Sequence, residues 1–243
     1  MDDRSRWNRR ATAYPRYEKG ENTYEARMLR LISENGIDFR GKRVLDLGCG
    51  SGMYTIRIAQ MAESVTALDI SDEMLRILTE DAAANGVTNI TPVNADWLDY
   101  KPGEAFDIIF AAMTPALFSD EGKEKLMAMN APQIVHMAYA GRQYSSIFGP
   151  LYEKYNIDRP FLRESDIMAE WLDTKGITSK RVIAEGHWEQ EYTDEALKER
   201  VRQFTEQSGK YISADLLEHF RIPDTDRYAD RVGYRIGIIF IQA

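Results

Sequence analysis

The chain has 243 residues, 44% of them apolar, and its 39 acidic and 31 basic side chains give a net charge of −8. This length fits one domain, or one domain with a modest insertion, and the acidic balance argues against non-specific nucleic-acid binding, which needs a basic surface. Cys49 is the only cysteine, which excludes an internal disulfide and any metal site built on several thiolates.

Targeting signals are absent from the sequence pattern. The first ten residues, MDDRSRWNRR, contain no apolar signal-peptide region, and the longest apolar runs are interrupted well short of a membrane span. We therefore expect a cytoplasmic protein that acts without a membrane.

Short apolar strands alternate with helical segments along the chain. The helical segment after residue 70 is the clearest, because Ser71 is a suitable N-cap and Asn85-Gly86 a suitable C-terminal stop. Pro92 indicates an edge strand, since proline cannot donate a hydrogen bond to a neighbouring strand. The predicted strands are 43–47, 64–70, 89–95, 106–112, 133–140, 178–185 and 233–243, and the predicted helices are 53–62, 71–86, 120–131, 165–176, 194–207 and 214–220.

This alternation predicts an α/β fold, a doubly wound and mostly parallel seven-stranded sheet with helices on both faces. We expect a single domain over residues 1–243. The stretch 187–233, between the last two strands, is longer than a tight hairpin. We expect a helical insertion there, which serves as a substrate cap or as a dimer surface; the sequence does not decide between the two.

Acidic residues and glycines gather where a sheet of this kind binds its ligand. Ligands lie beyond the carboxyl ends of the strands, and Asp46, Asp69 and Asp96 all fall there. The loop 48–52, GCGSG, departs from the dinucleotide fingerprint, because its third glycine comes one residue early and Met53 stands in the expected place. Three carboxylates are a poor setting for a pyrophosphate. They suit a ligand with a cationic centre and several hydroxyl and amine donors, such as S-adenosylmethionine.

Several spaced motifs carry a family resemblance. VLDLGCGSGMYT, ALDIS, NADWLDY and FDIIFA, between Arg43 and Ala112, resemble the class I S-adenosylmethionine-dependent methyltransferases in type, order and spacing. The segment RWNRRATAYPRY resembles the lead-in of small-molecule members. The resemblance implies a Rossmann-like methyltransferase fold with an antiparallel last strand, S-adenosylmethionine as the cofactor, and a helical N-terminal segment, residues 1–40, that folds over the cofactor as a lid.

The same resemblance implies roles for particular residues. Asp46 reaches the methionine end of the cofactor, Asp69 accepts both ribose hydroxyls, and Asp96 accepts from the adenine amine. Alternatives from the residues alone stay open: Asp46 or Asp96 as a helix cap, Trp97 as plain core and Cys49 as a small loop filler. The full implied cofactor set is Asp46, Gly48, Cys49, Gly50, Asp69, Ile70, Asp96, Trp97 and Ala111.

The acceptor of the methyl group is less well indicated. After the fourth predicted strand the chain reads AAMTPAL, which lacks the Pro-Pro-aromatic motif of enzymes that methylate exocyclic amines of nucleobases. A pyrimidine carbon-5 enzyme needs a cysteine nucleophile in its substrate pocket, and Cys49 lies in the glycine loop instead. No cluster of acids marks a metal-assisted site. A small-molecule acceptor is favoured, with a protein side-chain acceptor or a non-catalytic S-adenosylmethionine-binding partner protein as alternatives.

Candidate residues for the acceptor come from the N-terminal segment, the fourth and fifth strand ends and the region past the sixth strand. Tyr17, Met113, Thr114, Tyr139 and Arg142 are the substrate candidates, with core packing as the alternative for Tyr139 and surface exposure for Arg142. His187 is the candidate general base, and Tyr14 the second catalytic candidate. We expect no metal. The acceptor atom, the need for a base and the oligomeric state, monomer or homodimer, stay open.

Overall fold

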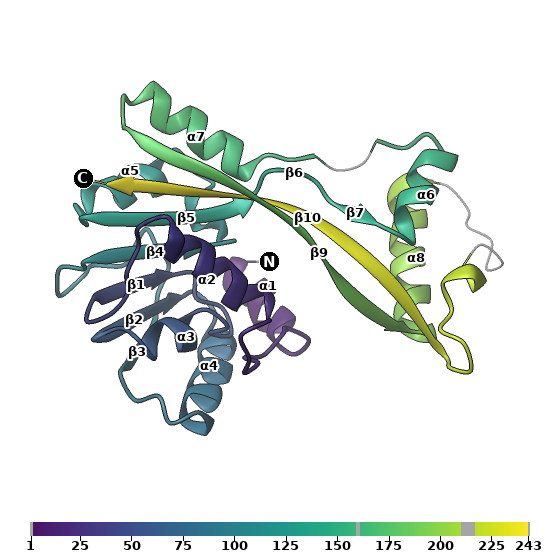
Figure 1. Cartoon of the computed structure of the whole chain (residues 1–243), viewed down its shortest axis with the longest axis horizontal. Helices are drawn as coiled ribbons and strands as arrows, with labels where there is room; N and C mark the ends of the chain where they lie inside the picture. Colours follow the sequence, from purple (N-terminus) through teal and green to yellow (C-terminus); the bar gives the residue numbers. More distant parts are fainter. Residues whose placement is uncertain (1, 159–160, 210–216, 243) are drawn as a thin grey trace. The chain divides into compact units, whose positions relative to one another are not determined.

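The computed structural model describes residues 2–158, 161–209 and 217–242. The chain divides into two compact units. The first unit contains Met1–Ala138, Glu164–Val182 and Gly237–Ala243, and the second contains Tyr139–Arg163 and Ile183–Ile236. Each unit is described by itself below (Figure 1).

The first unit is built on a parallel sheet. Its strands are β1 (Arg43–Leu47), β2 (Ser64–Asp69), β3 (Ile90–Asn94), β4 (Ile108–Ala112), β5 (Gln133–Tyr139) and the ends of β9 (Ser179–Thr193) and β10 (Arg227–Gln242). The order is β3-β2-β1-β4-β5-β10, with β9 paired to β10. Neighbours from β3 to β5 are parallel, and β10 runs in the opposite direction (Figure 1). The prediction of a mostly parallel sheet with an antiparallel last strand is confirmed.

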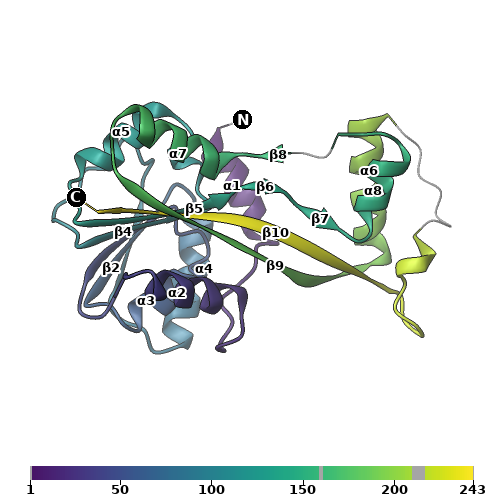
Figure 2. The same ribbon diagram turned by 45° about the horizontal axis from the view of Figure 1, so that its top comes forward.

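Helices cover both faces of this sheet. They are α1 (Asp3–Ala11), α2 (Tyr24–Glu34), α3 (Thr55–Ala59), α4 (Asp72–Ala84), α5 (Asp120–Ala128) and α7 (Glu164–Thr174), with a 3-10 turn η1 (Pro115–Leu117). Figure 2 shows α5 and α7 on one face and α2 and α3 on the other. Helix α3 is shorter than the predicted 53–62, because the chain must turn after Ala59 to reach β2 at Ser64.

Local signals in the sequence explain the elements that hold the site. The Ser71 hydroxyl accepts the backbone N–H of Met74 and caps α4, as predicted. Asn85 ends this helix, and Gly86 follows at a φ of 68°. Strand β3 lies at the edge of the sheet, which agrees with Pro92 within it.

One part of the core of the first unit lies between the sheet and α7, and buried residues of α2 and α3, such as Ile32 and Ile56, belong to the core as well. Leu45, Ile109 and Ile239 on the strands pack in one cluster with Trp171 and Leu172 of α7. Burying side chains of this size stabilises a fold by about 1.5 to 3 kcal/mol each. The sheet that carries the strand ends is therefore a firm support for the loops that follow them.

The second unit has a smaller core of its own. Its elements are β6 (Gly141–Arg142), β7 (Tyr144–Ser145), α6 (Phe148–Lys154), β8 (Phe161–Leu162), α8 (Asp194–Ser208), a 3-10 turn η3 (Glu218–Phe220) and the remaining parts of β9 and β10. β6 pairs with β8 and β7 with β10, both antiparallel. Phe148, Tyr192, Leu197 and Phe204 pack together in the core.

Two strands are longer than the sequence pattern predicts. β9 continues past residue 185 to Thr193, and β10 begins at Arg227 instead of 233. The predicted helix 194–207 is confirmed as α8, capped by the Thr193 hydroxyl. Of the predicted helix 214–220, residues 214–216 lie outside the described residues, and 218–220 form the 3-10 turn. The boundary of the insertion, 187–233, stays a prediction.

Candidate cofactor site

The loop after β1 depends on glycine at three positions. Gly48, Gly50 and Gly52 have φ values of 73°, 54° and 87°, a left-handed region that other residues rarely adopt. A Cβ on Gly48 would lie 2.1 Å from the Thr114 hydroxyl oxygen, and one on Gly52 would lie 2.5 Å from Leu78. These two glycines therefore allow the loop to pack on the protein itself. A Cβ on Gly50 would make only an ordinary contact with the Tyr14 ring, at 3.8 Å, so at Gly50 glycine is required by the positive φ and not by close packing.

Asp69, at the end of β2, holds this loop from the other side. Its Oδ2 accepts the backbone N–H of Gly50 at 2.8 Å, and its Oδ1 accepts that of Ser71, also at 2.8 Å. Burial raises the pKa of Asp69, and these backbone hydrogen bonds lower it in part. Each carboxylate oxygen can accept a second hydrogen bond, so both oxygens remain able to accept a ligand hydroxyl.

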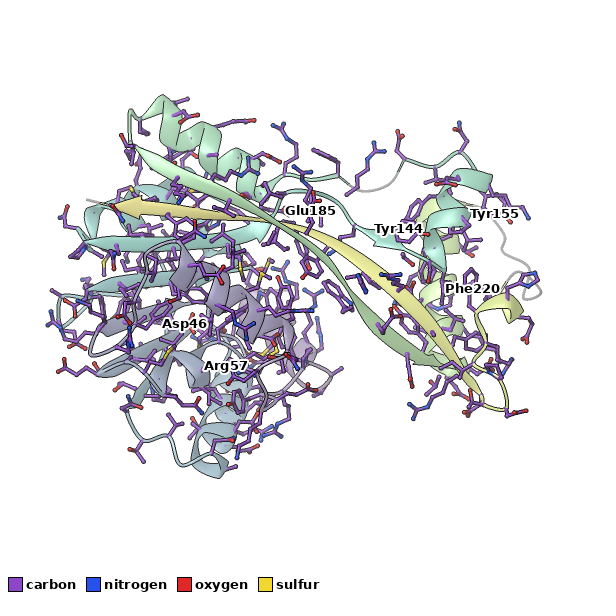
Figure 3. The ribbon with its side chains drawn as sticks, in the orientation of Figure 1. Asp46, Arg57, Tyr144, Tyr155, Glu185 and Phe220 are labelled. Carbon is purple, nitrogen blue, oxygen red and sulfur yellow. The ribbon has the colours of Figure 1, made fainter. Side chains whose placement is uncertain are left out.

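Asp46, within β1, is a buried carboxyl group (Figure 3). Burial raises the pKa of Asp46 to about 7, the Thr55 hydroxyl lowers it, and the nearby Asp69 charge raises it further. The Thr55 hydroxyl donates to Asp46 Oδ2 at 2.6 Å, whereas no side chain caps the N-terminus of α3. The helix-cap alternative for Asp46 is therefore not what the structure shows.

Cys49 lies between the two acids. Burial raises the pKa of its thiol well above the usual range, and the Asp69 and Asp46 charges add to this effect. The thiol therefore stays protonated and makes a poor nucleophile. Cys49 acts as a small residue within the loop, which favours the loop-filler alternative.

Of the residues after β3, Asp96 is partly exposed to solvent and Trp97 is buried in the core. Asp96 is partly exposed and accepts the backbone N–H of Leu98 at 2.8 Å, a local turn contact. The Trp97 side chain is only 4% exposed and donates its indole N–H to the Gly122 carbonyl at 3.0 Å. It belongs to the core of the first unit, so the core alternative describes its ring. Ala111 of β4 is likewise fully buried.

One residue near this edge was missed by sequence reasoning. Asn94, at the end of β3, pairs in register with Asp69. Its amide donates to the carbonyls of Asp69 and Ile70 at 3.2 and 3.0 Å and so fixes the backbone that carries Ile70. A polar residue at the end of a predicted edge strand, next to Asp96, was the available signal.

The loop after β4 packs on the glycine loop. Met113 has a φ of 53°, an uncommon conformation for a residue other than glycine, and its N–H donates to the Met137 carbonyl at 2.7 Å. Thr114 is buried and caps η1. Because Thr114 fills the space in front of Gly48, the structure brings these two predicted residues together.

The N-terminal segment is docked on the same edge of the first unit. The Asn8 amide oxygen accepts from the Ser71 hydroxyl at 2.6 Å, and the amide nitrogen donates to Asp72 at 2.8 Å. The Ser51 hydroxyl of the glycine loop donates to the Pro15 carbonyl at 2.6 Å. The Tyr14 ring contacts the cluster of α1 and α4. The segment therefore contacts both the glycine loop and α4.

Arg16 makes the strongest polar link of this segment. Its guanidinium donates to both carboxylate oxygens of Asp81 and also reaches Glu80. Tyr17 adds its own link, because its N–H donates to Asp81 at 3.3 Å and its ring lies 5.3 Å beneath the Arg57 guanidinium. The bidentate geometry fixes the chain between α1 and α2.

Arg16→Gln is expected to loosen this segment without unfolding the protein. Exposed ion pairs contribute at most about 1 kcal/mol, so backbone amides of residues 12–20 should exchange hydrogen about threefold faster. Hydrogen-exchange mass spectrometry measures this. Arg40→Gln is the matched control, because Arg40 pairs with the nearby Asp38 outside this segment. Equal exchange in both variants would contradict a role for Arg16 in docking.

Comparison with known proteins shows what the region around the glycine loop is similar to. Residues 44–131 match the family model described as a methyltransferase domain, and this range begins in β1 and ends after α5. It contains the glycine loop, Asp69 and Asp96. Residues 44–131 are a methyltransferase domain of the class I fold.

Two curated relatives indicate how far the likeness extends. Ribosomal protein L11 methyltransferase of Porphyromonas gingivalis is 33% identical over 108 residues, which cover 44% of this chain and 37% of that protein. Ubiquinone biosynthesis O-methyltransferase of Rhizobium etli is 41% identical over 70 residues, 28% of each chain. The chain thus matches less than half the length of these relatives.

Solved structures extend the likeness over most of the chain. The YcgJ protein from Bacillus subtilis has a TM-score of 0.58 at 15% identity and covers 89% of this chain and 98% of its own. A phosphoethanolamine N-methyltransferase 2 from Haemonchus contortus, in complex with S-adenosylhomocysteine, has a TM-score of 0.51 at 16% identity and covers 89% of this chain and 52% of its own. Identities this low show the fold alone.

The carboxylates of the methyltransferase domain fit S-adenosylmethionine, the cofactor of this family. No cation is among the groups that shift the pKa of Asp46 or Asp69, and both pKa values are raised. Buried carboxyl groups in this state gain from a ligand that brings its own positive charge and hydroxyl donors.

Three predicted residues belong to the second unit, so the cluster around the glycine loop is built without them. Tyr139 lines a cavity of the second unit. Arg142 is exposed in β6. His187 is exposed in β9 and accepts a hydrogen bond from the Arg231 guanidinium, 2.9 Å from its Nε2. Their roles toward substrate stay predictions.

The part of the chain that the structure describes contains neither a metal-binding cluster nor a membrane-spanning helix. Within residues 2–158, 161–209 and 217–242, no group of three or more histidine, cysteine, aspartate or glutamate side chains is arranged to hold a metal ion. Within the same ranges, no helix has the length and apolar composition needed to cross a bilayer.

Proposed function

We propose that the protein transfers a methyl group from S-adenosylmethionine to a small-molecule acceptor. The observation that carries this proposal is a pair of buried carboxyl groups, Asp46 and Asp69, beside an intact glycine loop. Burial raises the pKa of both groups. A protein that had lost cofactor binding would have no reason to keep this arrangement, because a buried carboxylate without a cation is costly. This argues against the non-catalytic alternative.

In this proposal different residues contact different parts of the cofactor. Asp46 faces the methionine end and balances its ammonium group. The two oxygens of Asp69 accept the ribose hydroxyls, and the backbone at Gly50 lies against the cofactor. Ile70 packs on the adenine, and Asp96 accepts from the adenine amine. Gly48 and Cys49 shape the loop, while Trp97 and Ala111 support it from the core.

When bound, S-adenosylmethionine supplies a methyl group on a good leaving group, so the chain needs mainly to position the acceptor and exclude water. Tyr14 is placed for this by its contact with the glycine loop. Tyr17, Met113 and Thr114 are further acceptor-side candidates in the first unit. Tyr139, Arg142 and His187 are the candidates of the second unit, with His187 as the general base.

A small molecule is the favoured acceptor because the chain lacks the residues for two kinds of nucleobase methylation. It has no Pro-Pro-aromatic motif for exocyclic amines, and it has no cysteine besides Cys49 that could serve as the nucleophile for pyrimidine carbon-5. The two curated relatives differ in this respect, since one name refers to a ribosomal protein and the other to ubiquinone biosynthesis. A protein side-chain acceptor is therefore the second candidate. The experiment below separates the two.

The test has a binding arm and a transfer arm. Calorimetric titration of the purified protein should give micromolar binding of S-adenosylmethionine and none of NAD. The protein is then incubated with S-adenosylmethionine carrying a labelled methyl group and with a cell extract divided by size. Label in the fraction below about 1 kDa supports a small-molecule acceptor, and label in the protein fraction supports the second candidate. Binding without transfer to either fraction would overturn the enzymatic proposal.

A further inference from the structure

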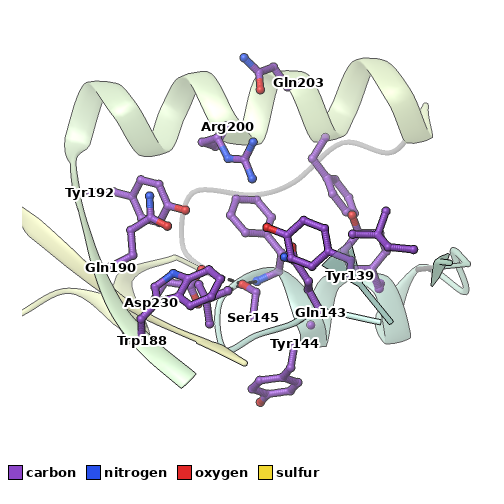
Figure 4. A pocket seen from close by; sticks show the side chains of 16 residues that line it. Tyr139, Gln143, Tyr144, Ser145, Trp188, Gln190, Tyr192, Arg200, Gln203 and Asp230 are labelled. Atoms are coloured by element: carbon purple, nitrogen blue, oxygen red, sulfur yellow. Dashed lines mark hydrogen bonds between the residues drawn. The ribbon is translucent and has the colours of Figure 1, made fainter. Parts of the chain in front are cut away.

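The second unit contains a cavity of about 320 Å³ that the cofactor residues do not touch. Helix α8 forms one side, and β7, α6 and the second-unit parts of β9 and β10 form the others (Figure 4). Cavities that bind small organic molecules begin at about this volume. One or two fused rings with a small substituent would fill it.

Aromatic side chains make a large part of the cavity wall. Tyr139, Phe148, Trp188, Tyr192 and Phe204 all line it. Their rings are held by neighbours: Trp188 stacks on Tyr234 with centroids 5.3 Å apart, and Phe204 packs edge-on against Tyr152 at 5.1 Å. Fixed aromatic faces are suited to a flat apolar ligand, because stacking then costs little side-chain entropy.

Arg200 brings a positive charge to this wall. Figure 4 shows its side chain extending from α8 toward the space above Tyr139 and Gln143. Its guanidinium lies 5.7 Å from the Phe148 ring centroid. Burial raises the pKa of Tyr192, and the Arg200 charge lowers it in part. Among residues 2–158, 161–209 and 217–242, no carboxylate forms an ion pair with Arg200, whereas Arg202 on the same helix pairs with Glu199 and Glu206.

The acidic residue of the cavity wall is already engaged. The Asp230 carboxylate accepts from the Ser145 and Ser146 hydroxyls and from the Ile147 N–H, at 2.8 to 3.2 Å. These partners all contact Oδ1, while the carboxylate keeps its negative charge within the wall. The cavity wall thus carries both signs, and Arg200 is the cation on it that can pair with an anionic ligand.

We propose that this cavity binds a flat aromatic molecule that carries a carboxylate. The ring lies among Tyr139, Trp188 and Phe148, and the carboxylate pairs with the Arg200 guanidinium. The Gln143 and Gln190 amides, which also line the cavity, can bond to polar ring substituents. The site uses none of the residues assigned to S-adenosylmethionine, so it stands whether or not methyl transfer is the reaction.

The test titrates the full chain with 2-naphthoate and with its neutral counterpart 2-naphthamide. Because Arg200 is exposed and solvent screens its charge, 2-naphthoate should bind about threefold more tightly than 2-naphthamide. Arg200→Gln should remove this preference. Arg202→Gln is the matched control, because Arg202 lies two residues further along α8 and does not line the cavity; this variant should keep the preference. Trp188→Ala should weaken both compounds alike, with Trp188→Phe restoring most of the affinity.

Two results would overturn the proposal: equal affinity of both compounds for the unchanged protein, or a preference that survives Arg200→Gln. Titration of the same variants with S-adenosylmethionine keeps this outcome separate from the proposed function, because Arg200 is not among the cofactor residues. Unchanged cofactor binding in Arg200→Gln would show that its first unit is folded, and unchanged affinity for 2-naphthamide would show that the cavity of the second unit is intact.

Discussion

Asp69→Asn is expected to weaken the binding of S-adenosylmethionine by at least about 100-fold while the protein stays folded. The carboxylate supplies two charged acceptors for the ribose hydroxyls, each worth about 1.5 to 3 kcal/mol, and the amide keeps only one neutral acceptor. Calorimetric titration measures the loss. The amide oxygen can still accept one backbone N–H, from Gly50 or Ser71, so the glycine loop keeps part of its support.

Asp69→Ala is a harsher change, since it leaves both backbone N–H groups without their acceptor. It should lose cofactor binding as well and also lower the melting temperature. Asp99→Asn is the matched control, because Asp99 is an exposed acid on the same side of the domain and holds no part of the loop. If Asp69→Asn bound S-adenosylmethionine as the unchanged protein does, the assignment of the ribose-binding residue would be wrong.

The strands and the glycine loop could be predicted because their signals are local. Ser71 caps α4 through its own hydroxyl, and the φ values of Gly48 and Gly50 are set by the turn that follows a buried strand. The order of Asp46 and Asp69 along the chain placed them at one edge, since parallel strands end on the same side. The sequence therefore predicted the position of these residues, but not the hydrogen bond that the Gly50 N–H donates to the Asp69 carboxylate.

Other features depend on contacts that no short stretch of sequence contains. Trp97 follows Asp96 directly, yet its ring turns into the core because the Gly122 carbonyl accepts its N–H there. Gly48 was placed in the cofactor set from its motif alone, and the structure adds that its missing side chain makes room for Thr114. Both outcomes were decided by residues more than 20 positions away.

The second unit shows the same limit. Residues 186–193 alternate weakly between polar and apolar, and their continuation of β9 depends on pairing with β10. The aromatic cavity is assembled from segments around residues 139–152, 188–192 and 200–204. Tyr139 was singled out from the sequence, but Arg200 was not, because one arginine in a charged helix looks like any other.

Binding of S-adenosylmethionine is expected to weaken as the pH falls below 7, by about tenfold per unit, because of Asp46. In the ligand-free protein burial raises the pKa of Asp46 to about 7, so the carboxyl group is largely protonated at pH 6. The cationic cofactor favours the carboxylate, so its binding must then release close to one proton. Calorimetry at pH 6 in buffers of different ionisation enthalpy measures this release.

Folding should depend on pH in the opposite sense, which makes the assignment to Asp46 specific. A carboxyl group whose pKa is raised from 3.8 in the unfolded chain to about 7 in the folded one stabilises the fold while protonated. Asp46 should therefore make the free energy of unfolding of the ligand-free protein fall as the pH rises from about 4 through 7. His136, whose pKa burial lowers to about 4, makes the free energy of unfolding rise over much of the same range, so the Asp46 slope is measured as the difference between the unchanged protein and Asp46→Asn. Asp46→Asn should remove this slope, abolish the proton release and weaken cofactor binding at every pH. The slope that remains in Asp46→Asn comes from other groups, among them Asp69, whose pKa is raised, and His136, whose pKa is lowered. An unchanged slope would mean that Asp46 does not titrate in this range and that its charge is not what holds the cofactor.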